Sequence, residues 1–233
     1  MKIALLGYGK MGKMIEKIAL SRGHEIVAKI DINSTETDIT KADVAIDFSI
    51  PDAAFNNITL CLENRIPVIS GTTGWLDKYP EAVALCKKND GAFIYASNYS
   101  LGVNIFFQIN EYLAKIMNNH AQYDVTMEEI HHTQKLDAPS GTAITLAEGI
   151  IKHTEKTKWT LEDPKENEIP ISAKRIDAVP GTHTVNYQSE IDSISMTHTA
   201  NSREGFALGA VVAAEWIVGK SGVFTMKDVL NLG

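Results

Sequence analysis

The chain has 233 residues, of which 44% are hydrophobic and 22% are charged, and its formal net charge is −7 at pH 7. This length fits one large domain or two small ones, and the ordinary composition excludes a disordered, collagen-like or coiled-coil chain. The acidic balance argues against a general nucleic-acid-binding protein, because such proteins need clustered lysine and arginine.

The N-terminus and the cysteines bear on the location of the protein. The apolar run after Lys2 has only four residues, too few for a signal peptide, and no stretch approaches the roughly 20 apolar residues of a membrane span. Cys61 and Cys86 lie in predicted helices without CxxC spacing, which favours inert thiols in a reducing compartment over a disulfide framework. We therefore expect a cytoplasmic protein that binds neither membranes nor nucleic acids.

Short apolar runs alternate with helical patterns over the first hundred residues. This alternation, with strands buried on both faces, predicts an α/β fold with a Rossmann-like, doubly wound parallel sheet. Residues 31–42 are short and polar, with little room for a crossover helix. We expect strands at 2–7, 26–30, 44–48, 67–70 and 93–96, and helices at 10–21, 53–63 and 79–88.

The pattern changes in the second half of the chain. Strand-like alternation over 171–198, together with a strand at 125–132 and helices at 103–117 and 141–153, predicts an α+β domain whose mixed sheet is half covered by helices. We expect residues 156–168 to form an exposed excursion and 222–230 a tail. An apolar helix at 205–218 should return to the first domain. We therefore place one domain at 1–102 with 204–233 and the other at 103–203, with hinges near 99–104 and 201–204.

A glycine motif follows the first predicted strand and opens the first helix. Its first glycine suits a tight turn, its second a close approach to a pyrophosphate, and its third close packing of helix and strand. Asp31 follows the motif by nineteen positions, where a carboxylate accepts hydrogen bonds from a ribose. The pattern predicts dinucleotide binding, and the alternative is an ordinary turn with a surface aspartate. The motif is Gly7-Tyr8-Gly9-Lys10-Met11-Gly12.

Asp31 also bears on the choice of cofactor. A carboxylate at this position repels a 2′-phosphate, and the next residue is Ile32 rather than a cation. The sequence therefore favours NADH over NADPH, although Lys29 or Lys41 could still reach a phosphate.

Three further loops close strands at the carboxyl edge of the predicted sheet, where ligands bind in doubly wound folds. Small hydroxylated residues there can approach a nicotinamide without a clash, so we expect these loops to line the cofactor; the alternative is plain turns. The loops are Phe48-Ser49, Gly71-Thr72-Thr73-Gly74 and Ser97-Asn98-Tyr99.

Two histidines and a lysine lie within five residues of the second domain, at His131, His132 and Lys135. Imidazoles relay protons near neutral pH, and a lysine ammonium can donate a proton or pair with a carboxylate. Ser140-Gly141-Thr142 then opens a helix whose free N–H groups suit a carboxylate. We expect a site for a small anionic substrate. The alternatives are solvated surface charge or a metal pair, and no third ligand stands at metal spacing, so we expect no metal.

The stretch from Glu129 to Ala143 resembles the signature E-x-H-H-x-x-K-x-D-x-P-S-G-T-A of the 4-hydroxy-tetrahydrodipicolinate (dihydrodipicolinate) reductases. The likeness covers nearly the whole chain. It includes the glycine motif, Asp47-Phe48-Ser49, Gly71-Thr72-Thr73-Gly74, Asn98-Tyr99-Ser100-Leu101-Gly102-Val103-Asn104, Pro180-Gly181-Thr182-His183-Thr184-Val185, and Ser202-Arg203 before Phe206-Ala207.

The resemblance implies reduction of a cyclic dicarboxylate with NADH or NADPH to tetrahydrodipicolinate, on the diaminopimelate route to lysine. It implies a dinucleotide-binding first domain, and a second domain that binds substrate and joins a homotetramer through its sheet. Because the two sites lie on separate domains, we also expect the substrate domain to close over the nicotinamide. His131 would donate or accept a proton and Lys135 would donate one. The remaining implied contacts are His132, Ser140, Gly141 and Thr142 for the substrate carboxylates, and residues 7–12, Asp31, 71–73, Ala96, Ser97, Asn98 and Tyr99 for the cofactor.

The chain departs from the commoner family pattern in its shorter glycine motif, its short 33–41 stretch and Ile32 in place of an arginine. These departures fit a shorter branch of the family. Two alternatives stay open from the residues: another Rossmann-type dehydrogenase of amino-acid or homoserine type, and an NAD(H)-sensing protein without turnover.

Overall fold

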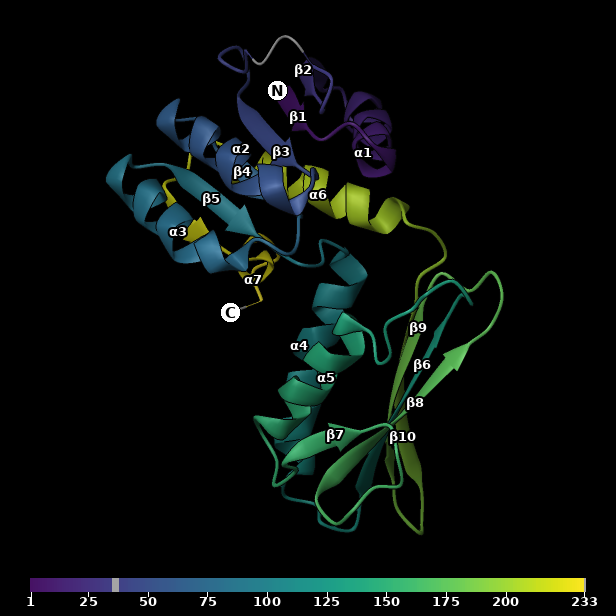
Figure 1. Cartoon of the computed structure of the whole chain (residues 1–233). Coiled ribbons are helices and arrows are strands. Elements are labelled where there is room, and N and C mark those ends of the chain that lie inside the picture. Colours follow the sequence, from purple (N-terminus) through teal and green to yellow (C-terminus); the bar gives the residue numbers. More distant parts are fainter. Residues whose placement is uncertain (35–37, 233) are drawn as a thin grey trace. The chain divides into compact units, whose positions relative to one another are not determined.

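The computed structural model describes residues 1–34 and 38–232, so the expectation for 31–42 lies partly outside the described residues. The chain divides into two compact units (Figure 1). Unit 1 comprises Met1–Leu101 with Glu204–Gly233, and unit 2 comprises Gly102–Arg203.

Unit 1 is built on a six-stranded parallel sheet with the order β11-β5-β4-β3-β1-β2. The strand order reverses at β1, because β2 pairs with one of its edges and β3 with the other. Such a reversal opens a crevice at the carboxyl ends of the strands. The strands are β1 (Lys2–Leu6), β2 (Glu25–Ile30), β3 (Val44–Asp47), β4 (Val68–Ser70), β5 (Ala92–Tyr95) and β11 (Gly222–Phe224).

Helices cover both faces of this sheet, as the buried apolar runs predict. One core contains Ile3 and Leu5 with side chains of α1 (Lys10–Ser21), α6 (Glu204–Ile217) and α7 (Met226–Val229). The other contains Ala4 and Leu6 with side chains of α2 (Pro51–Glu63) and α3 (Tyr79–Lys88), which follows the short 3-10 helix η1 (Leu76–Lys78). Alternate residues of β1 therefore enter opposite cores, which is the period of two of a strand.

Unit 2 has a mixed five-stranded sheet with the order β10-β9-β6-β8-β7. Strands β7, β8 and β6 run parallel, while β6–β9 and β9–β10 pair antiparallel, which confirms the expected second sheet. Helices α4 (Leu101–Met117) and α5 (Gly141–Ile151) share a core with its inward side chains. The strands are β6 (Asp124–His131), β7 (Lys158–Thr160), β8 (Glu168–Arg175), β9 (Thr182–Gln188) and β10 (Ser193–Thr199).

Two sequence expectations were wrong. Residues 156–168 are not only an exposed excursion, because they contain the edge strand β7, which pairs with β8. Residues 222–230 are not a tail, because β11 pairs with β5 and α7 follows it behind a capping box of Thr225 and Asp228. Both missed strands have three residues, which is too short for a hydrophobic period to stand out, and their pairing with distant strands defines them.

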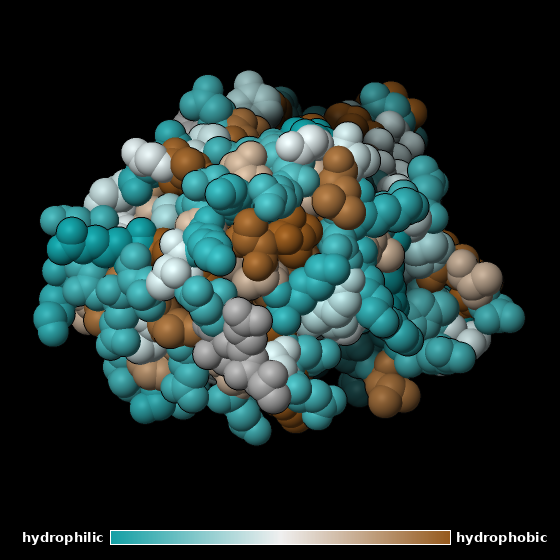
Figure 2. Space-filling view, turned by 90° about the horizontal axis from the view of Figure 1, so that it is seen from above, coloured by the Kyte–Doolittle hydropathy of each residue, from teal (hydrophilic) through white to brown (hydrophobic). Residues whose placement is uncertain are grey.

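The surface view shows mostly hydrophilic residues on the face seen from above, with hydrophobic ones in small separate groups (Figure 2). Among the described residues, no helix combines the length and the hydropathy that crossing a membrane requires.

Candidate functional site

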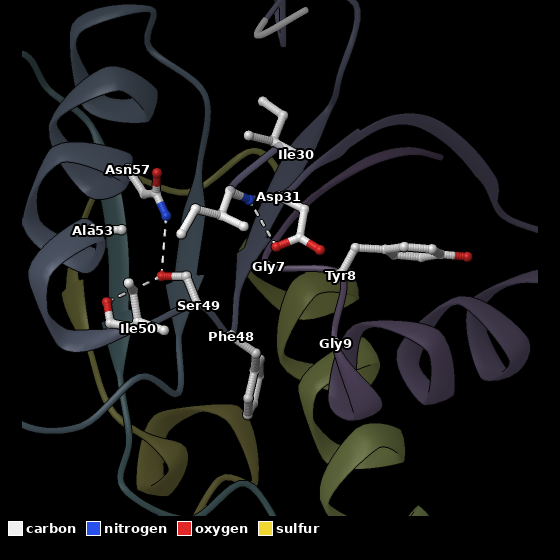
Figure 3. A pocket seen from close by; sticks show the side chains of 11 residues that line it. Gly7, Tyr8, Gly9, Ile30, Asp31, Phe48, Ser49, Ile50, Ala53 and Asn57 are labelled. Carbon is white, nitrogen blue, oxygen red and sulfur yellow. Dashed lines mark hydrogen bonds between the residues drawn. The ribbon is translucent and has the colours of Figure 1, made fainter. Parts of the chain in front are cut away.

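A pocket of about 310 Å³ lies at the strand reversal of unit 1. Its walls come from the carboxyl ends of β1, β2 and β3 and from the start of α2. Figure 3 shows Tyr8 and Asp31 on one side and Ser49, Ile50 and Asn57 on the other. The lining residues are Gly7, Tyr8, Gly9, Ile30, Asp31, Ile32, Phe48, Ser49, Ile50, Ala53 and Asn57.

The three glycines of the motif have three different surroundings. Gly7 has φ +94°, and a Cβ added there would lie 2.1 Å from the carbonyl oxygen of Phe48. A Cβ on Gly12 would lie 2.3 Å from the carbonyl oxygen of Gly7, so helix and strand touch there. A Cβ on Gly9 would meet nothing within 4 Å among the described residues. The start of α1 is therefore tightly built on one side and open at Gly9, where a phosphate could approach the backbone.

Asp31 and Lys29 both lie near the carboxyl end of β2, but they differ in their charged partners. Asp31 is exposed, and its carboxylate accepts only the neighbouring amide of Ile32 at 2.8 Å among the described residues. The Lys29 ammonium lies 2.5 Å from the Glu16 carboxylate and 4.9 Å from the centre of the Tyr8 ring. The hydrogen bond from Lys29, followed by one from Tyr8, lowers the pKa of Glu16. Lys29 is thus paired with Glu16, whereas Asp31 lies at the edge of the pocket and has no cation partner among the described residues.

A buried carboxylate behind the pocket was given no role by the sequence reasoning. Asp47 ends β3 and accepts hydrogen bonds from Ser49 at 2.7 Å, Asn57 at 2.9 Å, Ser70 at 2.8 Å and Thr72 at 2.7 Å. Burial raises its pKa, and these four hydrogen bonds oppose that rise. Asp47 therefore joins the loops after β3 and β4. The quoted Asp47-Phe48-Ser49 stretch contains it, but its four donors come from three separate segments.

The other expected cofactor residues differ in accessibility. Gly71, Thr72 and Thr73 line a second pocket of about 230 Å³ with Met11 and Phe48. The Thr72 hydroxyl is turned inward to Asp47. The Tyr99 side chain is buried in the core, where its hydroxyl donates to the carbonyl oxygens of Ser70 and Ile94. Ala96 and Asn98 are half-buried and Ser97 is exposed after the end of β5.

In unit 2, two adjacent strands place three titratable groups together. Glu129 and His131 are two residues apart on β6 and therefore share its inward face, and the register pairs Glu129 with His183 of β9. The His131 and His183 rings meet edge to face with centres 5.0 Å apart. All three side chains are buried. The sequence reasoning found His131 but assigned no role to Glu129 or His183, although both lie in stretches quoted for the resemblance.

Glu129 is the fully buried centre of this cluster. One oxygen accepts the Ser140 amide at 2.9 Å and the other accepts the Arg175 guanidinium at 3.0 Å. Burial alone would raise the pKa of Glu129, but the hydrogen bonds from Ser140 and Arg175 outweigh it, and the pKa is lowered. Burial lowers the pKa of His131, and it lowers that of His183 to about 4. The cluster therefore holds an ionised carboxylate beside two neutral imidazoles at pH 7.

The ligand atoms of Glu129, His131 and His183 lie within 4.8 Å of one another, a spacing that a metal ion could use. In the sequence, His131 and His132 stand as an adjacent pair with no third ligand at metal spacing. In the structure the partners of His131 are different residues. Because both Glu129 oxygens already accept protein donors, one of them the cation Arg175, we interpret the cluster as a buried polar network.

The loop after β6 carries the lysine. The Lys135 ammonium lies 2.9 and 2.8 Å from the two Asp137 carboxylate oxygens, and its hydrogen bond lowers the pKa of Asp137. The Lys135 side chain is 22% exposed and that of Asp137 is 60% exposed. His132 is half-buried at the start of this loop. Solvent screens the Lys135–Asp137 ion pair on this surface loop, so the pair is weak and another anion can replace Asp137.

The expected helix start is present, but its serine is not free. Ser140 is the N-cap of α5: its hydroxyl accepts the Ala143 amide at 3.2 Å and lies 3.1 Å from Nε2 of His183. Gly141 is exposed and Thr142 is half-buried. The amides of Gly141 and Thr142 find no acceptor within the described part of the chain. These two N–H groups are left to bind an anion.

Comparison with known proteins bears on both units. The family model for "Dihydrodipicolinate reductase, N-terminus" matches residues 1–99, and that for "Dihydrodipicolinate reductase, C-terminus" matches residues 102–230. A curated 4-hydroxy-tetrahydrodipicolinate reductase of Christiangramia forsetii is 60% identical over 99% of this chain and 98% of that protein. Another, of Archaeoglobus fulgidus, is 38% identical over 99% of this chain and 100% of that protein.

The fold also resembles solved structures. A dipicolinate-bound dihydrodipicolinate reductase from Paenisporosarcina sp. TG-14 superposes with a TM-score of 0.78 at 23% sequence identity, covering 96% of this chain and 97% of that one. At this identity the likeness supports the fold, with its parallel sheet and its second, mixed sheet.

Proposed function

Since the chain belongs to the dihydrodipicolinate reductase family, we propose which of its residues bind the reactants and move the proton. The protein is an oxidoreductase that reduces 4-hydroxy-tetrahydrodipicolinate to tetrahydrodipicolinate with a pyridine nucleotide, in the diaminopimelate route to lysine. This replaces the alternatives of a homoserine-type dehydrogenase and of an NAD(H) sensor. One observation carries the residue assignment: His131, the main chain of Lys135 and the start of α5 all adjoin the Glu129–Arg175 network.

For the nucleotide, the pocket at the strand reversal supports the proposal. Its backbone is open at Gly9, and the N-terminus of α1 suits a pyrophosphate. Asp31 would accept hydrogen bonds from the adenosine ribose. The bound nucleotide supplies the hydride. The other proposed contacts are Gly7, Tyr8, Lys10, Met11, Gly12, Phe48, Gly71, Thr72, Thr73, Ala96, Ser97, Asn98 and Tyr99, with Thr72 and Tyr99 acting through their main chains.

We propose that NADH is preferred over NADPH. Asp31 presents an unpaired carboxylate where a 2′-phosphate would lie, and the exposed neighbour Ile32 offers it no charge. Lys29, the nearest cation in sequence, is held by Glu16 at 2.5 Å. A 2′-phosphate would have to take Lys29 from that carboxylate while lying close to Asp31, and both requirements weaken its binding.

For the substrate, we propose that its two carboxylates bind hydrogen-bond donors that the site already offers, and that one of them displaces an anion of the protein. One carboxylate binds the Gly141 and Thr142 amides at the start of α5. The other binds the Lys135 ammonium, which leaves Asp137 for it, with His132 beside them. Ser140 supports the first carboxylate indirectly, because its hydroxyl caps the helix and its amide donates to Glu129.

The reduction of 4-hydroxy-tetrahydrodipicolinate to tetrahydrodipicolinate adds one hydride and one proton, and it releases the 4-hydroxyl group as water. We propose that the Lys135 ammonium donates the proton and that neutral His131 exchanges protons with the substrate site. The lowered pKa of His131, caused first by burial, keeps its imidazole neutral at pH 7 and available as an acceptor. The buried neighbours of His131 exclude water, which strengthens the electrostatic interactions of His131 and Lys135 with the substrate.

The test is Lys135→Ala, assayed with freshly made condensation product of pyruvate and aspartate semialdehyde by the loss of NADH absorbance. We expect kcat to fall by about 100-fold or more, while the Kd for NADH changes by less than about twofold. Asp31→Ala is the matched variant in unit 1 and should show the opposite pattern, weaker NADH binding with little change in the rate at saturation. The reverse outcome for either variant contradicts the assignment.

We also propose a homotetramer joined through the sheet of unit 2. The support is that α4 and α5 pack on one face of this sheet, while side chains such as Thr184 and Thr197, whose hydroxyls lie 3.1 Å apart, are left on its strands β9 and β10 outside that core. Light scattering on the purified protein tests it, and a monomer would contradict it.

A further inference from the structure

The loop that carries Lys135 has little hydrophobic anchorage. Leu136 is 96% exposed, and Thr133, Gln134 and Ala138 are exposed as well. Pro139 is buried, but it lies at the far end of the loop, next to the start of α5. Burial of apolar surface therefore contributes little to holding the ammonium in place. Whatever fixes Lys135 relative to the substrate must act through polar contacts, most of them with the main chain.

Arg175 at the end of β8 makes such contacts. Its Nε donates to the carbonyl oxygen of Lys135 at 3.2 Å, and its Nη2 donates to the carbonyl oxygen of Asp137 at 2.5 Å. The same Nη2 donates to Glu129 at 3.0 Å, and Nη1 donates to the Lys174 carbonyl oxygen at 2.9 Å. All three guanidinium nitrogens are engaged with the protein, so Arg175 acts on the loop rather than as a direct ligand of the substrate.

Glu129 extends this connection to the other half of the substrate site. Its second oxygen accepts the amide of Ser140, the residue that caps α5. A single ion pair, in which Glu129 is buried and the Arg175 side chain is 20% exposed, thus links the lysine loop to the helix whose Gly141 and Thr142 amides are free. The pairing of Arg175 with His131 in the register of β6 and β8 places this link at the end of both strands. Charge-assisted hydrogen bonds in a buried setting are strong and directional, which suits a positioning function.

We propose that Arg175 and Glu129 are positioning residues that hold the Lys135 loop and the N-terminus of α5 in the arrangement a dicarboxylate requires. This inference rests on the substrate roles proposed above for those two elements. Because Arg175 uses a planar fork to reach two carbonyl oxygens of the loop, the carbonyl oxygen of Lys174 and a carboxylate at once, a lysine, which is a single point donor, cannot make all of these contacts.

The experiment compares Arg175→Met and Arg175→Lys with Lys174→Met in the intact protein. Lys174 is the adjacent residue of β8, and its side chain pairs instead with Glu128 at 2.5 Å, so its loss removes an ion pair without touching the loop. We measure kcat and KM for the substrate, the Kd for NADH, and hydrogen exchange of the amides of residues 132–140.

For Arg175→Met we expect kcat/KM for the substrate to fall by about 100-fold, in line with the cost of misplacing a reacting group. Exchange in residues 132–140 should become about tenfold faster or more, and the Kd for NADH should stay within about twofold. Arg175→Lys should recover only part of the loss. Lys174→Met should match the unaltered protein in all four measurements.

Unchanged kcat/KM in Arg175→Met, or slower catalysis without faster exchange in residues 132–140, overturns the inference. If Arg175→Met does not fold, Arg175→Lys and Glu129→Gln decide by the same two criteria. The proposed substrate roles fail separately: if Lys135→Ala retains turnover, the assignment of Lys135 as proton donor is wrong. If Lys135→Ala loses turnover while the Arg175 variants retain it, only the positioning role of Arg175 and Glu129 is wrong.

Discussion

The two ligand sites that we propose are built in opposite ways. In unit 1 the pocket is formed by backbone geometry: Gly7 and Gly12 bring strand and helix into contact, and Gly9 leaves the helix start open. In unit 2 the site depends on buried charge, with Glu129 and Arg175 linking a loop to a helix N-terminus. A nucleotide with a constant pyrophosphate can be bound by amides alone, whereas placing a proton donor beside a small dicarboxylate needs fixed charges.

The sharpest way to break this comparison is a pair of substitutions in the glycine motif. Gly7→Ala should be severely damaging, because its Cβ would lie 2.1 Å from a carbonyl oxygen and its φ is +94°. Gly9→Ala has open space and φ −78°, so the fold should tolerate it, while the methyl group should weaken NADH binding by about tenfold or more through the lost approach of the pyrophosphate. Thermal melting and NADH titration measure the two effects. Equal loss of stability in both variants would contradict a backbone-built pocket.

The buried histidines give unit 2 a dependence on pH. The pKa of His183 in the folded protein is about 4, below its unfolded value of about 6.5, so the unfolded chain binds more protons between these values. The contribution of neutral His183 to the free energy of unfolding is therefore fully present above pH 6.5. It decreases by about 3 kcal/mol as the pH falls towards 4.

His183→Gln should reduce that decrease, and His120→Gln, which alters an exposed histidine, should not. Urea unfolding between pH 7 and pH 4.5 measures the difference, since the carboxylates common to all variants cancel. Parallel pH profiles for His183→Gln and the unaltered protein would show that this histidine is not held neutral by the fold.

Asp47 sharpens the comparison, because it is a buried carboxylate beside the proposed nucleotide site. Asp47→Asn replaces one acceptor oxygen by a donor that faces the donors of Ser49 and Asn57 or of Ser70 and Thr72. We expect a loss of about 2 kcal/mol in unfolding free energy and weaker NADH binding, as the loops after β3 and β4 lose their common partner. Asp43→Asn, at an exposed carboxylate that accepts one amide, is the control and should cost less than about 1 kcal/mol. Equal costs for the two variants would rule out a structural role for the network.

The smallest expected effect concerns cofactor choice. Glu16→Gln releases Lys29 from its carboxylate partner and should shift the ratio of kcat/KM for NADPH over NADH upward by about threefold, in keeping with the modest worth of an exposed ion pair. Lys17→Gln, on the same helix but paired with Glu204, should leave the ratio unchanged. An unchanged ratio in Glu16→Gln would show that the pairing of Lys29 with Glu16 does not contribute to the preference for NADH.

Local patterns were sufficient to predict most of the fold. The alternation of apolar runs and helices predicted the parallel sheet and its covering helices, and alternation over 171–198 predicted the mixed sheet. The edge strands β7 and β11 were missed, because each has three residues and is defined by its partner strand rather than by its own sequence. Hydroxyls that looked accessible, those of Thr72 and Ser140, turned out to serve a buried aspartate and a helix cap.

The sequence by itself predicted where the chemistry should lie: at a glycine turn next to a strand, and at two histidines, a lysine and a helix start within a dozen residues. Each of these is a local arrangement, readable from spacing along one strand or one helix turn. Only the tertiary structure decided what holds them. Arg175 is 40 residues from the lysine loop it contacts, and His183 is 43 residues from the serine it approaches. These partners meet because strands β8 and β9 flank β6, a pairing that depends on the whole sheet and leaves no local period in the chain.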